Sequence, residues 1–208
     1  GGNKMEYLVY ASIVVSAIAT YLIARYGQEH YNKTLAGSFF IGTSITLILI
    51  DLTPPSMGLL TSYYTWIIIL VITVLLFLFS RICTYVVAAG AFMGMVIAAL
   101  VALVGMEPHQ TVGMIALVAG IVVTILLRKH LIKVLVGLFS GYYAGLTLTQ
   151  IVSVASPLEG VRQIVTSWSP LQIVILVLLA FAVYFQYCLH EKVFGAKTAA
   201  SPTSGGGE

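Results

Sequence analysis

Charged side chains are scarce in this sequence. Asp, Glu, Lys and Arg make up 8% of the 208 residues, whereas about a quarter is usual in a soluble domain. Hydrophobic residues make up 60%, and the mean hydropathy is +1.04. The long apolar runs also lack the period-two alternation of a membrane β-barrel. Because only helices and closed barrels satisfy every backbone polar group in lipid, the sequence predicts an all-α integral membrane protein whose solvent is the lipid bilayer.

Ionisable residues are also missing from the middle of the apolar runs. Asp51 lies at the end of an apolar run, Arg81 lies in a predicted turn between two spans, and the histidines lie at run ends or in connections. Proton relays and ion-coupled pumps usually place ionisable groups inside the bundle, and an intramembrane aspartyl protease needs two buried Asp. No basic block with interleaved aromatics indicates a nucleic-acid partner. We therefore expect a protein that is not an enzyme and that has no catalytic residues, no metal site and no cofactor.

Cysteine and proline are few, and the prolines lie outside the apolar runs. Cys83 and Cys188 are the two cysteines, too few for a disulfide framework. Cys188 is a candidate for palmitoylation because it lies near the end of the last apolar run; a buried, inert thiol is the alternative. The six prolines lie in connections or in the tail. Since none interrupts an apolar run, the sequence disfavours a transporter built from proline-broken helices.

Seven apolar runs reach a length close to the roughly 20 residues that cross a bilayer. We place the spans at 6–26, 34–51, 62–80, 82–104, 110–128, 131–152 and 170–189. The continuous run from Tyr63 to Val104 is about twice the length of one span, so it must contain two helices, with Arg81 near the break.

The remaining segments are short. A capping box at Ser156 and Glu159 predicts an outer interfacial helix at 157–168. We assign residues 1–5 to an N-terminal segment, the seven spans to one domain at 6–190, and residues 191–208 to a flexible tail. The beginning Gly-Gly-Asn-Lys, rather than Met, fits a processed precursor, a fragment or an added sequence.

Basic residues predict the orientation. Two of the ten Lys and Arg residues, Lys4 and Arg162, fall on one side of the predicted membrane, and the other eight fall in the tail and in the connections after the first, third and fifth spans. Cytoplasmic connections carry an excess of Lys and Arg. The N-terminus is therefore expected outside and the C-terminus in the cytoplasm.

A short sequence pattern recurs in alternate spans and indicates an internal repeat. The second, fourth and sixth spans contain Gly37-Ser-Phe39, Gly90-Ala-Phe92 and Gly137-Leu-Phe139 near the predicted cytoplasmic end. Each of these three spans is preceded by a short basic turn. Arg128-Lys129-His130 is the turn before the sixth span. The pattern predicts three repeated helical hairpins of antiparallel neighbours plus a seventh helix.

The glycines of these spans are candidate contact sites. Four-residue spacing puts Gly90 and Gly94 on one helix face, and Gly137, Gly141 and Gly145 on another; Gly37 is the counterpart in the second span. Small residues let helix backbones approach closely in lipid. We favour packing within one chain, with a homo-oligomer seam on span 131–152 as the alternative.

A stripe of hydroxyl groups follows the first span at Ser12, Ser16 and Thr20. Such groups can hydrogen-bond to their own helix or to a neighbouring helix. They could also line a narrow path for a neutral solute. We favour packing over permeation, and both interpretations stay open.

The basic hairpin and glycine-rich helix of residues 113–150, together with the count of seven spans, resemble the seven-pass domain shared by transmembrane protein 198 and seven-transmembrane superfamily member 3. The resemblance covers most of residues 6–190 and is carried by Gly120, Arg128-Lys129, Lys133, Gly137, Gly141 and Gly145. It implies a signalling scaffold or a protein of unassigned function, without catalytic residues. The first hypothesis is thus a non-enzymatic scaffold or subunit whose partners are other membrane proteins or a second copy. The alternative is a channel or carrier for a small neutral or weakly hydrated solute.

Overall fold

The computed structural model describes residues 2–52, 58–107, 109–155 and 170–195. These residues form helices and no strand. The helices are α1 (Gly2–Tyr26), α2 (Tyr31–Leu52), α3 (Tyr63–Leu78), α4 (Ser80–Leu103), α5 (Gln110–Leu126), α6 (Leu131–Ala155) and α8 (Pro170–Tyr184), the last continuing through the π-helix η1 (Phe185–Leu189) into α9 (His190–Phe194). The prediction of an all-α protein is confirmed for the described residues.

Helix ends differ from the prediction mainly at the two ends of the chain. Residues 2–5, expected as a separate segment, belong to α1. Residues 191–194, expected as tail, belong to α9, which ends at the C-cap Gly195. No proline or glycine lies between Pro170 and Gly195, so nothing stops the helix earlier. The interfacial helix predicted at 157–168 and the tail from 196 onward lie outside the described residues.

Four helices are long and apolar enough to cross a membrane, at Tyr7–Tyr26, Ser80–Val101, Leu131–Val152 and Ile173–Phe194. The helices Tyr63–Leu78 and Gln110–Leu126 are apolar but shorter. The long run from Tyr63 to Val104 divides into two helices at Phe79, close to the expected position. The length and composition of the described helices therefore support a membrane protein with at least four candidate spans.

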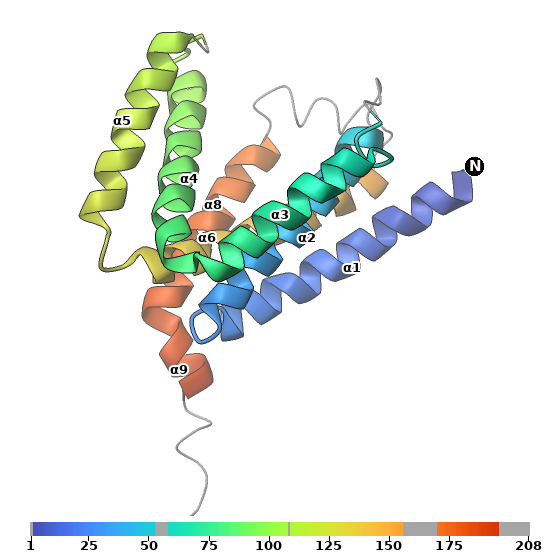
Figure 1. Cartoon of the computed structure of the whole chain (residues 1–208), viewed down its shortest axis with the longest axis horizontal. Coiled ribbons are helices and arrows are strands. Elements are labelled where there is room, and N and C mark those ends of the chain that lie inside the picture. Colours follow the sequence, from blue (N-terminus) through green and yellow to red (C-terminus); the bar gives the residue numbers. More distant parts are fainter. Residues whose placement is uncertain (1, 53–57, 108, 156–169, 196–208) are drawn as a thin grey trace, which may run out of the picture.

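The helices joined by the basic turns are not one another's main partners. α4 packs along α5, α2 packs against α3, and α6 lies between α1 and α8 (Figure 1). By contrast, α1 and α2 touch mainly near their turn, and α5 turns away from α6. The expected antiparallel pairing of 110–128 with 131–152 is therefore wrong, and the three repeated hairpins receive no support. A short turn holds two helices together only at one end, and side-chain fit selects the partner along the rest.

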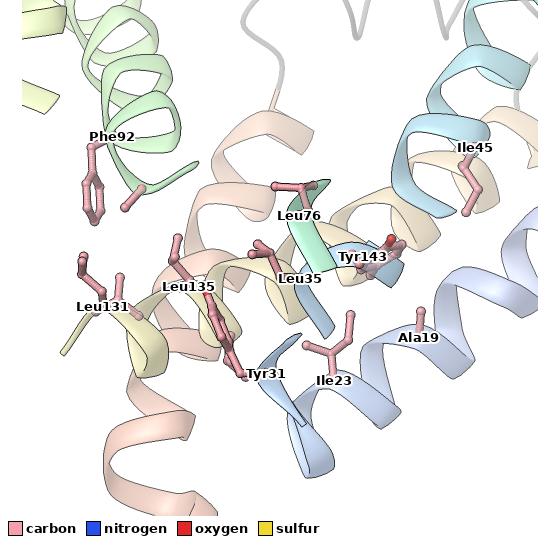
Figure 2. Packing of buried hydrophobic residues seen from close by; sticks show 14 residues of the cluster. Ala19, Ile23, Tyr31, Leu35, Ile45, Leu76, Phe92, Leu131, Leu135 and Tyr143 are labelled. Carbon is pink, nitrogen blue, oxygen red and sulfur yellow. The ribbon is translucent and has the colours of Figure 1, made fainter. Parts of the chain in front are cut away.

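The core lies where α1, α2, α4 and α6 meet. Leu135 and Val136 of α6 are fully buried, and Leu35 of α2 is nearly so. Tyr143 lies within the same cluster, with Ile23 of α1 nearby (Figure 2). This core places α6 at the centre of the helices, and residues of α6 take part in most of the sites described next.

Candidate functional site

The three glycines of α6 face α8. A Cβ atom added at Gly137 would lie 2.7 Å from Val183 Cα, and one at Gly141 would lie 2.9 Å from Leu179 Cα. At Gly145 the nearest atoms belong to the side chain of Ile175, at 3.1 Å. This face is already covered within the chain, so it is not available as the seam of a homo-oligomer.

The other three predicted glycines have a different environment. An added Cβ at Gly37, Gly90 or Gly94 would meet no atom within 4 Å. Gly90 and Gly94 lie on the exposed side of α4, while Gly37 lines a groove between α1 and α2. The shared Gly-x-Phe pattern therefore corresponds to three different surroundings: a helix contact, a groove and an exposed face.

The hydroxyls of α1 bond to their own helix. Ser16 Oγ donates to the carbonyl oxygen of Ser12 at 2.6 Å, and Thr20 Oγ1 donates to that of Ser16 at 2.9 Å. Ser16 is fully buried, and its Oγ also lies 3.3 Å from Gln150 Oε1 of α6. Ser12 donates to Leu8 in the same way. Ser16 is thus the member of the stripe that also contacts α6. Ser12, Ser16 and Thr20 line neither of the two hollows described next.

A pocket of about 410 Å³, open on one side, lies among α2, α4, α6 and α8, and we call it the inner cavity. Its walls are mainly apolar, with hydroxyl groups from α2 and α6. Thr46 Oγ1 and Tyr142 Oη lie 2.9 Å apart, which ties the two helices together. Thr43 also lines the cavity, and its hydroxyl has no hydrogen-bond partner among the described residues, so it is available to a bound molecule.

A second hollow of about 470 Å³ opens between α1 and α2, and we call it the groove. Its walls carry Ala19, Leu22 and Ile23 of α1 and Ile41 of α2. The groove exists because α1 and α2 diverge from the turn that joins them. His30, Lys33 and Thr34 lie at its polar end.

Ser38 and Tyr143 separate the two hollows, since both residues line both. Tyr143 Oη donates a hydrogen bond of 2.6 Å to the carbonyl oxygen of Ser38. The Ser38 hydroxyl is buried and has no hydrogen-bond partner in the described part of the chain. Most buried hydroxyls have a partner, so this group is suited to bonding a molecule that enters from either side. Sequence reasoning gave neither residue a role in a site. The available signal for Tyr143 was the pair Tyr142-Tyr143 in a glycine-containing apolar helix, and no sequence signal indicated Ser38.

A polar cluster joins the end of α1 to η1. Gln186, 2% exposed, accepts a hydrogen bond from Gln28 Nε2 at 2.6 Å and donates one to the carbonyl oxygen of Ala24 at 2.9 Å. His190 Nε2 lies 3.1 Å from the carbonyl oxygen of Arg25. These contacts satisfy carbonyls that the end of α1 leaves without helical partners. A single glutamine in an apolar run was the sequence signal for this cluster.

The described part of the chain contains two free cysteines and no cluster of metal-binding side chains. In the described ranges no group of three His, Cys, Asp or Glu side chains could hold a metal ion. Cys83 is partly buried and Cys188 is exposed, and both are free thiols. The exposure of Cys188 leaves palmitoylation open as a prediction and argues against a buried thiol there.

Known proteins offer no guide to these sites. No family model, no curated protein and no solved structure matches this chain. The functional argument therefore rests on the two hollows and the helix faces.

Proposed function

We propose that this protein is a non-enzymatic multi-pass membrane protein that binds a small neutral molecule in the inner cavity, as a carrier or channel does. The observation that carries the proposal is a cavity of about 410 Å³ at the meeting point of four helices, with hydroxyl groups on a mainly apolar wall. Ligand sites often combine apolar walls with a few polar groups and lie between the helices of bundles.

The lining selects the chemistry of the ligand. No Asp, Glu, Lys, Arg or His is among the residues that line the inner cavity. Taking an unpaired charge out of water costs far more than the hydroxyls can return. The ligand is therefore neutral and mainly apolar, with one or two groups that hydrogen-bond to Thr43, Thr46 or Ser38.

Photolabelling tests this proposal with a defined probe. A diazirine-bearing octanol, which is neutral and has one hydroxyl, should label residues of the inner cavity when the protein is irradiated in lipid nanodiscs. The variant Thr43→Phe should place a phenyl ring in the cavity, remove the free hydroxyl and reduce this labelling severalfold. Peptide mapping by mass spectrometry locates the adducts.

Two controls make the result decisive. Val118→Phe changes an exposed residue of α5 and should leave the labelling unchanged, while unlabelled octanol should compete with the probe. Adducts spread evenly over the exposed faces of α3 and α5 would indicate bulk partitioning and would contradict the proposal.

A second candidate function, the scaffold that the sequence favours, is supported by α4. Gly90, Gly94 and Ala98 are spaced four apart, and all three are exposed. Such a face fits close packing against a helix of another membrane protein or of a second copy. Gly94→Leu should reduce the amount of assembly detected by native mass spectrometry in mild detergent, whereas Gly113→Leu on α5 should not. Equal assembly in both variants would remove this candidate.

Seven spans, an outer N-terminus and a cytoplasmic C-terminus are part of the same proposal. The excess of basic residues at one side of the predicted membrane supports the orientation. Kinship with the seven-pass domain of transmembrane protein 198 rests on the glycine and basic residues named above and stays a prediction.

A further inference from the structure

The groove between α1 and α2 has a polar end and an apolar length, as a phospholipid does. We propose that it binds one anionic phospholipid, with an acyl chain between the helices and the phosphate at Lys33. This site is separate from the inner cavity, and the inference does not require the carrier function.

The arrangement of residues along α2 supports this polarity. His30, Lys33 and Thr34 lie where α2 begins, and Gly37 and Ile41 follow along the groove. At 1.5 Å per residue, Ile41 lies about 12 Å farther along the helix axis than Lys33. An acyl chain can run along this length while its phosphate stays at the end of the bundle.

The charge at the mouth is available for a phosphate. The only ion pair in the described ranges joins His109 and Glu107, far along the chain from Lys33. Glu29 lies in the same turn but lines a different pocket, together with Arg25. The Thr34 hydroxyl likewise has no hydrogen-bond partner among the described residues. Lys33 and Thr34 both line the groove, and neither side chain has a polar partner among the described residues, so both can donate to a phosphate.

The head group should provide the selectivity. An acyl chain gains little by moving from bulk lipid to an apolar groove, because both surroundings are equally apolar. A Lys near a membrane surface, however, favours an anionic lipid over a zwitterionic one. The groove is therefore expected to discriminate phosphatidylglycerol from phosphatidylcholine, although both carry the same chains.

Native mass spectrometry tests this directly. The full chain is reconstituted with equal amounts of phosphatidylglycerol and phosphatidylcholine of identical chains, then released into a mild detergent. One retained phosphatidylglycerol is expected on the wild-type protein. Lys33→Gln should lower the preference for phosphatidylglycerol about fivefold, the effect of one basic residue near the surface.

Filling the groove provides the second arm. Gly37→Trp adds a side chain where an added Cβ meets no atom, so it should displace the lipid without disturbing the helices. Gly113→Trp is the matched control, because Gly113 is equally uncrowded and lines neither hollow. Circular dichroism checks that both variants keep their helices.

The outcomes separate clearly. Loss of phosphatidylglycerol in Gly37→Trp but not in Gly113→Trp supports the proposal. Three results would overturn it. The first is equal retention of phosphatidylglycerol in these two variants, and the second is equal retention of both lipids by the wild-type protein. The third is an unchanged preference for phosphatidylglycerol in Lys33→Gln. Lys33→Gln decides the question even if Gly37→Trp does not fold, since Lys33 is an exposed side chain. Thr43→Phe should keep the lipid, which distinguishes failure here from failure of the inner cavity.

Discussion

Tyr143 donates a hydrogen bond of 2.6 Å from its Oη to the carbonyl oxygen of Ser38. The bond joins α6 to α2 at the boundary between the groove and the inner cavity, and the Tyr143 side chain is 1% exposed. One side chain therefore both fills the core and separates two hollow regions, which makes it the natural place to begin testing the structure.

Replacing Tyr143 by Phe should destabilise the protein by about 1 kcal/mol, the usual value of one hydrogen bond between membrane helices. The aromatic ring stays, so the packing changes little. Unfolding by sodium dodecyl sulfate in mixed micelles measures the difference. Tyr142→Phe is the control: Tyr142 is more exposed, and its one hydrogen bond to a described residue goes to Thr46, so a smaller effect is expected. Equal losses in the two variants would contradict a special role for the Tyr143–Ser38 bond.

The glycines of α6 should show a graded sensitivity. Gly137→Ala and Gly141→Ala push a methyl group against backbone atoms of α8, and each should cost about 1–3 kcal/mol, as overpacking does. Gly145→Ala should cost less, because the side chain of Ile175 can rotate away.

The same unfolding assay ranks these variants. Gly113→Ala, which meets no atom within 4 Å, should be neutral or slightly stabilising, since alanine favours the helix more than glycine does. If Gly137→Ala were as mild as Gly113→Ala, the close contact between α6 and α8 would be wrong.

Gln186 should contribute to the stability of the protein, although it lies in an apolar helix. Gln186→Leu removes the acceptor for Gln28 and the donor to the carbonyl oxygen of Ala24. A loss of about 1–3 kcal/mol is expected, the cost of leaving buried polar partners unpaired.

A double-mutant cycle with Gln28→Ala identifies the pairwise part of this loss. Non-additive effects of Gln186→Leu and Gln28→Ala are expected, because the two amides are in direct contact. Strict additivity would mean that the hydrogen bond between them contributes nothing to stability.

The orientation is testable through the two cysteines. Cys83 and Cys188 fall on the predicted cytoplasmic side, and both are free thiols. A membrane-impermeant maleimide should therefore miss both in intact cells and label Cys188 first after permeabilisation, since Cys188 is the more exposed. Treatment with hydroxylamine before labelling would reveal a palmitoyl group. Labelling of intact cells would reverse the orientation.

The sequence was sufficient to predict an all-α chain and the approximate positions of the helices in the described residues. Long apolar runs can satisfy their backbone groups in lipid only as helices, and this is a local property that composition reveals. The break at Phe79, between two adjoining apolar helices, was predictable for the same reason: the run is too long for one crossing.

Only the tertiary structure decided which helices meet. Gly37, Gly90 and Gly137 each begin a Gly-x-Phe triplet, yet Gly137 alone is packed against another helix. Likewise, the hydroxyls of α1 serve packing, whereas hydroxyls of α2 and α6 line the inner cavity. These differences depend on side-chain fit between segments that lie far apart in the chain, such as Ser38 and Tyr143, and no local pattern contains that information.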